Sequence, residues 1–278
     1  MGLEDDLATA LGASSVSFLG SGTFGDTWCA HDLDGSTEPL AVKVLRAEYF
    51  NPRLLARETG NLNEFDHHNI VRLHSVRTIR FQGEEHHVIV CEYIDGGSAG
   101  QALRAGARPS HKHVRKFARG LFEAVAELHA KDKIHRDLKP DNIMLRGGKW
   151  KQPVLIDFGL VRSLTGDTMT NYPALVGSIP YMAPEQLQGE RARKACDNWA
   201  CGVILYQLLT GTHPFFYGID IRAMEPEELV DLVSVPPPPL PADVPDDLTE
   251  LVMRLLTPDP PGVRGSAARA LKTIGGKI

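Results

Sequence analysis

The sequence predicts an α+β fold with two lobes: a small lobe built mainly on an antiparallel β-sheet and a larger lobe built mainly from helices. From about Val16 to Tyr93, short runs of β-forming residues alternate with turn residues, and one helical stretch at 52–65 interrupts them. After Gly96 and Gly97 the pattern changes to long amphipathic helices. The 278 residues are enough for one large domain or two unequal ones.

The order of the elements follows from the same patterns. The expected strands of the first lobe lie at 16–20, 27–32, 40–45, 69–76 and 86–93. In the second lobe, helices are expected at 113–130 and 199–209, and two short strands at 142–145 and 153–157. The proline-rich run at 236–241 lies between two helical patterns, so we interpret it as a connector rather than a polyproline ligand. We place the boundary near 92–98, with the first lobe at 12–95 and the second at 96–275.

Composition excludes several classes of protein. The chain is 42% hydrophobic and 23% charged, which is ordinary for a globular protein. A net charge of −5 without any basic block disfavours a nucleic-acid partner. No apolar run reaches the ~20 residues that span a bilayer, and the acidic start lacks the features of a secretory signal. The four cysteines show no CxxC spacing, so we expect a reduced, cytoplasmic setting and no membrane segment in this chain.

A glycine-rich segment, Gly20-Ser-Gly-Thr-Phe-Gly25, lies between two expected strands. Backbone N–H groups that carry no side chains can approach a phosphate chain closely, so the segment is a candidate phosphate site. The alternative is a glycine-rich hairpin that binds nothing. A dinucleotide-binding fold is disfavoured, because the glycines are followed by a strand and not by a helix.

A lysine occurs in the middle of an apolar strand. Lys43 lies in the run at 40–45, where a buried ammonium group needs an anionic partner. Glu58, in the helical stretch that follows, is the obvious candidate. The alternative is an exposed lysine on an edge strand.

Charged and amide side chains are concentrated in the segment His135-Arg-Asp-Leu-Lys-Pro-Asp-Asn142, between a long helix and a strand. Asp157-Phe-Gly159 follows at the end of the next apolar strand. The amide oxygen of Asn142 and the carboxylate of Asp157 are hard oxygen ligands, and they would suit Mg²⁺ that also keeps water and phosphate ligands.

These motifs resemble the catalytic domain of the eukaryotic-like (Hanks-type) Ser/Thr protein kinases, and most of all its bacterial members. The resemblance covers about residues 12–275 and implies the bilobal protein-kinase fold as one domain with nothing else in the chain. The matching residues are Gly20–Gly25, Lys43, Glu58, His135–Asn142, Asp157–Gly159, Ala183-Pro184-Glu185, Asp197 and Arg264.

By this resemblance the reaction is transfer of the γ-phosphoryl group of ATP, with Mg²⁺ or Mn²⁺, to Ser or Thr hydroxyls of proteins. Lys43 would hold the ATP phosphates and would itself be held by Glu58. Asp137 would orient the hydroxyl and accept its proton, and Lys139 would neutralise charge on the transferred group. Asn142 and Asp157 would bind the metal.

The remaining expected roles also follow from the resemblance. Residues expected to contact ATP are Leu19, Gly20, Ser21, Gly22, Thr23, Phe24, Gly25, Thr27, Ala41, Lys43, Cys91, Glu92, Ile94 and Met144. Asp197 would anchor the segment His135–Asn142, called the catalytic segment below, and Glu185 with Arg264 would form a buried ion pair. Thr168 and Thr170 are the expected autophosphorylation sites, and Arg136 offers a cation with which a phosphorylated residue could pair.

Two alternatives stay open at this point: a catalytically silent relative that acts as a scaffold, and a small-molecule kinase of the aminoglycoside type. The expected partners are ATP, protein substrates and, for autophosphorylation in trans, a transient second copy of the chain. No nucleic acid is expected.

Overall fold

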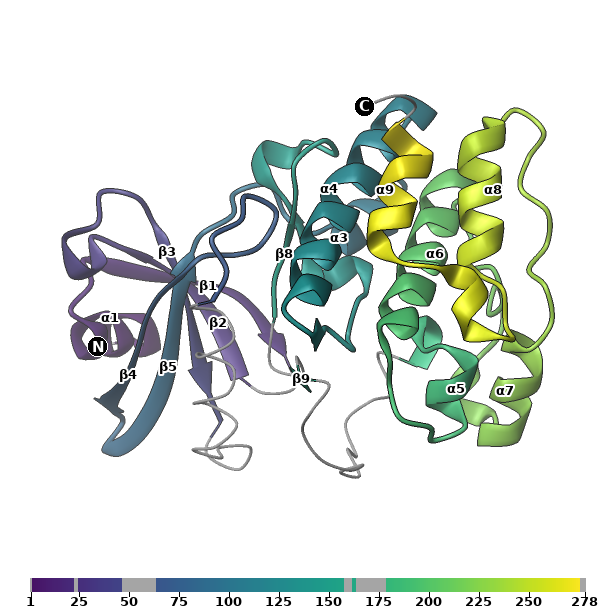
Figure 1. Cartoon of the computed structure of the whole chain (residues 1–278). Coiled ribbons are helices and arrows are strands. Elements are labelled where there is room, and N and C mark those ends of the chain that lie inside the picture. The colour runs from purple at the N-terminus through teal and green to yellow at the C-terminus, as the bar shows by residue number, and fades with distance from the viewer. Residues whose placement is uncertain (1, 23–24, 47–63, 158–161, 164–178, 276–278) are drawn as a thin grey trace. The chain divides into compact units, whose positions relative to one another are not determined.

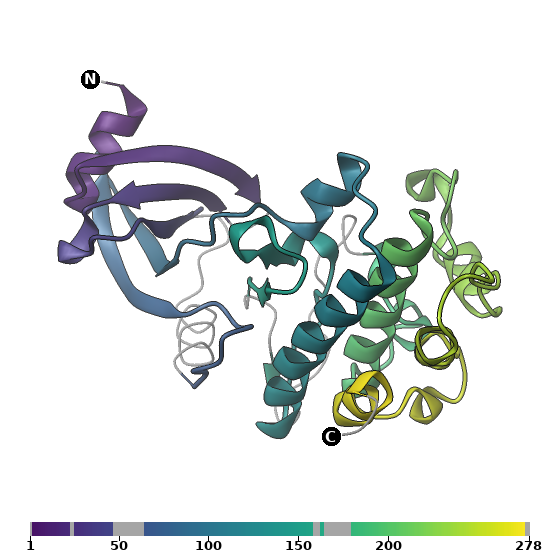
Figure 2. The ribbon, with the colours of Figure 1, turned by 90° about the horizontal axis from the view of Figure 1, so that it is seen from above.

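The computed structural model describes residues 2–22, 25–46, 64–157, 162–163 and 179–275. The chain divides into two compact units, Met1–Asp95 and Gly96–Ile278 (Figures 1 and 2). The first is built on an antiparallel sheet and the second is mainly helical. The predicted α+β class is therefore confirmed.

The sheet of the first unit has five strands in the order β1-β2-β3-β5-β4, and each neighbouring pair is antiparallel. The strands are β1 (Ser15–Gly22), β2 (Gly25–His31), β3 (Leu40–Leu45), β4 (Leu73–Phe81) and β5 (Glu84–Glu92), with a short 3-10 helix η1 (Leu33–Gly35) after β2. A bulge between Phe18 and Gly20 interrupts the register of β1 against β2. Since β3 has a partner on each side, it is a central strand.

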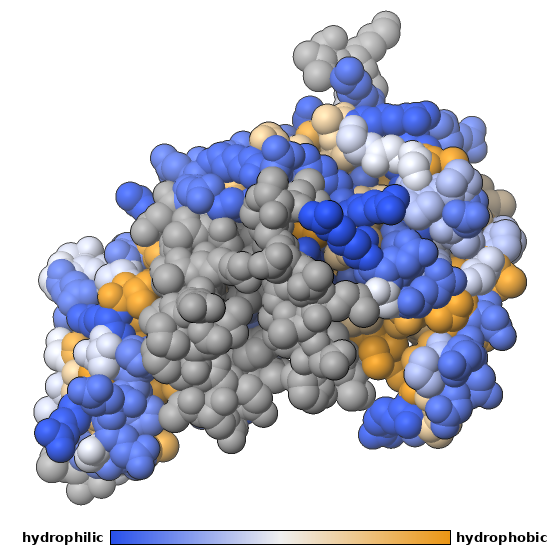
Figure 3. Space-filling model, turned by 60° about the horizontal axis from the view of Figure 1, so that its bottom comes forward, coloured by the Kyte–Doolittle hydropathy of each residue, from blue (hydrophilic) through white to orange (hydrophobic). Residues whose placement is uncertain are grey.

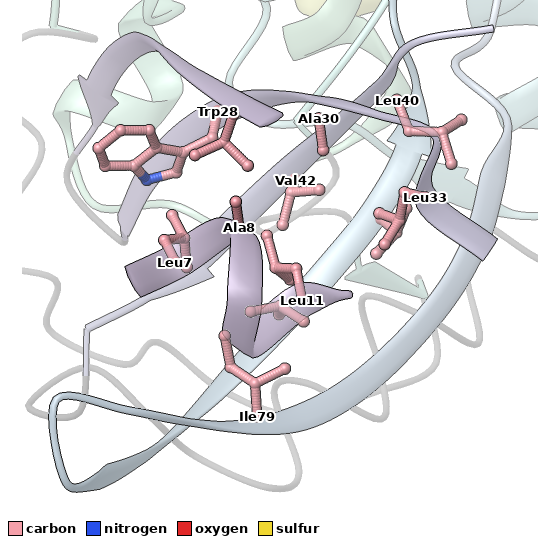
Figure 4. Packing of buried hydrophobic residues seen from close by; sticks show 12 residues of the cluster. Leu7, Ala8, Leu11, Trp28, Ala30, Leu33, Leu40, Val42 and Ile79 are labelled. Atoms are coloured by element: carbon pink, nitrogen blue, oxygen red, sulfur yellow. The ribbon is translucent and has the colours of Figure 1, made fainter. Parts of the chain in front are cut away.

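One face of this sheet is covered by a helix that the sequence patterns did not predict, α1 (Leu3–Leu11) (Figures 1 and 4). Three acidic residues in its first turn complement the positive end of the helix dipole. Leu7 and Leu11 are buried against the sheet. Their neighbours in this core include Val16, Trp28, Ala30, Leu33, Val42, Ile79, Val88 and Val90.

The strand expected at 69–76 lies further along the chain, as β4. Ile70 and Val71 are buried and resemble the start of a strand, but the pairing is set by the two-residue turn at Gln82 and Gly83. Both have a positive φ, 53° and 83°, as a type I′ hairpin requires. This turn pairs Phe81 with Glu84 and so extends β4 beyond the predicted end.

The second unit is a group of packed helices. They are α3 (Ala99–Arg104), α4 (His111–Ala130), α5 (Pro184–Leu187), α6 (Lys194–Thr210), α7 (Pro226–Val233), α8 (Asp246–Leu255) and α9 (Ala267–Gly275). α6 contacts α4 and α8, and α4 also packs against α9 (Figure 1). Most of α6 is buried, as its apolar sequence predicts.

Two short antiparallel strand pairs lie beside α4. β6 (Lys133–Ile134) pairs with β9 (Arg162–Ser163), and β7 (Ile143–Leu145) pairs with β8 (Pro153–Leu155). Short 3-10 helices complete the unit: η3 (Pro140–Asn142), η4 (Arg146–Gly148), η5 (Ile179–Tyr181), η6 (Ile221–Ala223) and η7 (Pro261–Arg264). The proline run at 236–241 joins α7 to α8 without forming a helix or strand.

The outer surface carries both apolar and hydrophilic residues. Figure 3 shows a face on which apolar residues are set among hydrophilic ones. In the part of the chain that is described, none of the helices combines the length and the apolar character that crossing a bilayer requires.

Candidate active site

Four of the residues predicted to bind ATP share one face of the sheet. Strand residues alternate between faces, and α1 covers the face that carries Trp28, Ala30 and Val42. The intervening residues point to the opposite face, where the register pairs Thr27 with Lys43 and, two residues along, Ala41 with Cys91. Thr27, Ala41, Lys43 and Cys91 therefore lie together on the face opposite α1.

The glycines of the hairpin differ in what surrounds them. A Cβ atom added at Gly20 would meet no heavy atom within 4 Å, and one at Gly22 would make only ordinary contact, at 3.6 Å from the carbonyl oxygen of Gly25. At Gly25, by contrast, a Cβ would overlap the carbonyl oxygen of Val44 on β3. Close approach to β3 therefore requires a glycine at position 25, whereas packing within the described chain requires none at positions 20 and 22.

Lys43 lies on the central strand β3 and is partly buried. The edge-strand alternative is therefore wrong, because β2 and β5 flank the strand. Its expected partner Glu58 lies outside the described residues, as do Thr23 and Phe24 of the glycine-rich segment.

The other predicted ATP contacts are spread along the chain. Leu19 lies at the bulge of β1 and is 42% exposed. The Glu92 N–H donates to the carbonyl of Arg72, and the Glu92 carboxylate accepts from the Arg72 N–H, both at 3.0 Å. Ile94 is buried in the first unit. Met144 belongs to the second unit, on β7.

The catalytic segment brings three of its predicted residues into direct contact. The Lys139 ammonium donates to both oxygens of the Asp137 carboxylate, at 3.1 and 2.9 Å. The Asn142 amide Nδ2 donates to the same carboxylate at 3.0 Å and to the Asp137 carbonyl at 2.8 Å. Asp137 is buried, so a fixed cation and a fixed amide hold its carboxylate in one orientation.

The carboxylate of Asp197 anchors the backbone at the start of this segment. It accepts the N–H of His135 at 2.9 Å and the N–H of Arg136 at 3.0 Å, and His129 Nε2 donates to it at 2.9 Å. Arg136 needs this support because its φ is +71°. Burial by itself raises the pKa of the Asp197 carboxyl, but the hydrogen bond and charge of His129 outweigh it and lower the pKa.

His135 joins the catalytic segment to the strand that leads to Asp157. Its Nδ1 accepts from the Asp137 N–H at 3.4 Å, and its Nε2 donates to the Ile156 carbonyl at 3.3 Å. Burial lowers the pKa of His135, in keeping with a neutral ring that accepts at one nitrogen and donates at the other.

Asn142 and Asp157 lie at neighbouring strand ends. The Ile156 N–H donates to the Asn142 carbonyl at 2.9 Å, and Ile143 pairs with Leu155 in the adjoining hairpin. Asp157 has a φ of +62°. Their amide and carboxylate oxygens are hard ligands of the kind that Mg²⁺ takes in small numbers beside phosphate and water.

Glu185 and Arg264 form a buried bidentate pair. The guanidinium donates to the carboxylate at 2.6 and 3.0 Å. The arginine side chain is 0% exposed and the glutamate side chain is 6% exposed. Arg264 also donates to the carbonyls of Thr257 and Pro258, at 2.9 and 2.8 Å, and lies 4.7 Å from the centre of the Trp199 ring.

Sequence reasoning missed several members of these networks. His129 and Trp199 carry no local motif, because their partners are far away in the chain. Arg104 was also missed: it binds the Asp141 carboxylate through two hydrogen bonds, at 2.7 and 3.1 Å. Its position in the last turn of α3, close to the glycine pair, gave no signal of a partner.

The phosphorylation sites that we expected, Thr168 and Thr170, lie outside the described residues. Among the residues that are described, no group of three or more His, Cys, Asp or Glu side chains could hold a metal ion by itself. A site with two protein oxygens and the oxygens of a phosphate substrate is compatible with that finding.

Comparison with known proteins gives a consistent result. A family described as the protein kinase domain matches residues 14–273. The chain is 32% identical over 204 residues to the serine/threonine-protein kinase PrkC of Bacillus subtilis, an alignment that covers 71% of this chain and 30% of that protein.

Two further relatives align over more of the chain. It is 30% identical over 274 residues to the serine/threonine-protein kinase PkaA of Streptomyces coelicolor, covering 92% of this chain and 48% of the relative. It is 30% identical over 251 residues to the serine/threonine-protein kinase PknA of Mycobacterium tuberculosis, covering 87% of this chain and 56% of the relative. The chain thus spans about a third of the first relative and about half of the other two.

Proposed function

Because the chain belongs to the protein kinase domain family, we propose that it transfers the γ-phosphoryl group of ATP to Ser and Thr hydroxyls of proteins. The names of its relatives support the choice of hydroxyl. We assign ATP binding to residues 12–95 and catalysis with protein-substrate binding to residues 96–275.

The contacts of Asp137 carry this proposal. A buried carboxylate held by Lys139 and Asn142 is oriented to accept a hydrogen bond from a substrate hydroxyl and then its proton. The Lys139 ammonium lies beside the same carboxylate, where it can neutralise charge that develops on the transferred phosphoryl group. In this chemistry positioning and electrostatics supply most of the rate enhancement, and no covalent intermediate on the enzyme is needed.

The chain's own oxygens fit a divalent metal. Asn142 uses its amide nitrogen to bind Asp137, which directs the opposite amide atom, the oxygen, away from that carboxylate. Asn142 and Asp157 would hold Mg²⁺ or Mn²⁺ with the ATP phosphates. A metal ion held there would neutralise the charge of those phosphates.

ATP binding is assigned to the exposed part of the glycine hairpin and to the face that carries Lys43. A side chain would fit at positions 20 and 22 without a clash inside the described chain. Glycines at these positions therefore support close approach of phosphates to the backbone. Lys43 would bind these phosphates and pair with Glu58. Thr27, Ala41 and Cys91, on the same face, would line the nucleotide site.

Autophosphorylation is part of the proposal. Thr168 and Thr170 would be the acceptor sites, a transient second copy of the chain would deliver the phosphate, and Arg136 would pair with the product. We propose a cytoplasmic setting for the reaction.

Incubation with labelled ATP and Mg²⁺ tests the proposed function. The wild type should label a generic basic protein, and Asp137→Asn should lower the rate at least about 100-fold, as loss of a general base does. Asp132→Asn is the matched control, because Asp132 lies on the surface and binds only Lys194 in the described contacts.

Two results would contradict the proposal. If the wild type and Asp157→Asn both transfer no label, the chain is a silent relative with a scaffolding role. If small alcohols are phosphorylated much faster than any protein, the chain is a small-molecule kinase.

A further inference from the structure

His213 lies in the turn that follows α6, outside every motif discussed so far. Its Nδ1 accepts two backbone N–H groups of its own turn, from Phe215 at 3.1 Å and from Phe216 at 3.0 Å. Its Nε2 lies 2.9 Å from the carbonyl oxygen of Pro180, more than thirty residues earlier in the chain. One ring therefore ties the turn to the segment η5.

The hydrogen bonds fix the form of the ring. A nitrogen that accepts two N–H groups carries no proton, so the proton is on Nε2, which donates to Pro180. Burial lowers the pKa of His213 to about 4. The ring is neutral near pH 7, and the direction of each hydrogen bond is determined.

The turn that presents His213 is itself rigidly anchored. The ring of Phe215 is stacked on Trp199, with centroids 5.3 Å apart and planes 6° from parallel. Trp199 in turn lies under the guanidinium of Arg264, which is paired with Glu185. His213 thus connects η5 to the same buried assembly that holds the start of α5.

Tyr181, the last residue of η5, is also in contact with His213. The ring of Tyr181 is in edge-to-face contact with His213, at 6.0 Å between centroids. Burial raises the pKa of Tyr181 to about 12, and the charges of Asp141 and Arg104 also act on it. Asp141 immediately precedes Asn142, one of the two residues that hold the Asp137 carboxylate.

We propose that His213 is a positioning residue for the protein substrate: by donating to the Pro180 carbonyl it holds Ile179–Tyr181 in the conformation against which the acceptor segment of the substrate docks. This inference rests on the proposed function. Any acceptor hydroxyl that reaches Asp137 brings its own backbone past the neighbouring surface, and we assign Ile179–Tyr181 to that surface because the charge of Asp141 acts on Tyr181. Within the described part of the chain, the hydrogen bonds and ring contacts of His213 involve only Pro180, Tyr181, Phe215 and Phe216, and none of these residues is assigned to ATP binding.

Three substitutions separate the two hydrogen-bonding roles of the His213 side chain, as donor and as acceptor. His213→Gln can keep the N–H donor to Pro180, His213→Asn can keep the acceptor for Phe215 and Phe216, and His213→Phe removes both while it keeps a ring. Loss of one neutral hydrogen bond corresponds to about a 3- to 10-fold change in an equilibrium constant.

Steady-state kinetics with myelin basic protein as substrate is the test. We expect His213→Phe and His213→Asn to raise the KM for this substrate about 3- to 10-fold, with the KM for ATP unchanged. His213→Gln should stay nearer to the wild type than His213→Asn. His113→Gln is the matched control, because His113 is exposed at the start of α4, where its ring contacts Ser110.

Each contrary outcome overturns the inference. One is an unchanged substrate KM in folded His213→Phe, and another is a variant that differs from the wild type only by a fall in apparent kcat in proportion to its folded fraction. If His213→Phe does not fold, equal substrate KM values for the Gln and Asn variants have the same consequence.

Amide hydrogen exchange separates this inference from the proposed function. The Met182 N–H donates to the Ile179 carbonyl at 3.0 Å, and its exchange should become faster in His213→Asn than in His213→Gln. A wild type that phosphorylates no protein would defeat the proposed function and the substrate role together. Unchanged exchange in an active enzyme would defeat only the role of His213.

Discussion

Replacing Glu185 by glutamine should remove a large part of the stability of the second unit. Glutamine has nearly the same volume but offers one acceptor oxygen where glutamate offers two. One Nη group of Arg264 would lose its carboxylate acceptor and face an NH₂ group instead. Since the arginine side chain is 0% exposed, water cannot replace the lost partner, and its charge stays buried without a counter-charge.

The size of the effect follows from that geometry. Breaking a buried ion pair by removal of one partner costs about 3–5 kcal/mol in the free energy of unfolding. The carbonyls of Thr257 and Pro258 still accept from Arg264, so we expect the lower half of that range. A loss of about 3 kcal/mol is a large share of the roughly 5–15 kcal/mol that stabilises a typical protein.

Urea unfolding, followed by circular dichroism and by tryptophan fluorescence, measures the loss. Coincidence of the two transitions is needed before a single free energy is assigned. The double variant Glu185→Gln/Arg264→Met should be more stable than the sum of the two single effects allows, because it leaves no buried charge alone.

A matched control is Arg222→Met. Arg222 also makes a bidentate contact, with Asp220, but both side chains are exposed, so no measurable change in stability is expected. The reasoning is refuted if Glu185→Gln costs less than about 1 kcal/mol, or if the effects of the two single variants simply add.

Three further predictions concern the glycine hairpin, the catalytic segment and pH. Gly25→Ala should lower the free energy of unfolding by about 1–3 kcal/mol because of overlap with β3, whereas Gly20→Ala should leave stability unchanged and raise the KM for ATP; equal behaviour of the two in thermal melts and ATP titrations would contradict this. Asp197→Asn should lower kcat about tenfold or more with little change in the KM for ATP, because its NH₂ group cannot accept the N–H groups that it faces; an unchanged kcat would show that the anchor is not needed. The pKa of His213 is about 4, below its ordinary value of 6.5, so the unfolded state binds the proton more tightly and the free energy of unfolding should fall by roughly 3 kcal/mol between about pH 6.5 and pH 4. Urea titrations should show a smaller fall in His213→Gln, and an identical pH profile would rule this explanation out.

Local patterns predicted the positions of most strands of the sheet and of the two longest helices, α4 and α6. Residues 40–45 are predicted and observed as a strand, and the helix predicted from His113 is α4, which starts at His111. The proline run at 236–241 joins two helices, as expected. These cases share one cause: hydrophobic spacing and turn residues act over a few positions, where sequence alone is informative.

α1 and β4 show two different reasons why a sequence pattern fails to place an element. α1 was not predicted although Leu3, Leu7 and Leu11 have helical spacing, because a nine-residue helix is marginal by itself and its stability comes from burial of Leu7 and Leu11 on the sheet. β4 was placed too early because Ile70 and Val71 are buried without belonging to a strand. The turn at 82–83 and the pairing with β5 decide where that strand lies.

The sequence by itself determined the kinds of chemical group in this protein and their order along the chain, including Lys43, Asp137, Asn142 and Asp157. Only the tertiary structure decided which groups meet. It placed Thr27, Ala41, Lys43 and Cys91 on one face, and it joined His129 to Asp197 and His213 to Pro180. The physical reason is that a motif fixes only the spacing of residues along the backbone. Hydrogen bonds and burial depend on distances through space, often between residues that are far apart in the sequence.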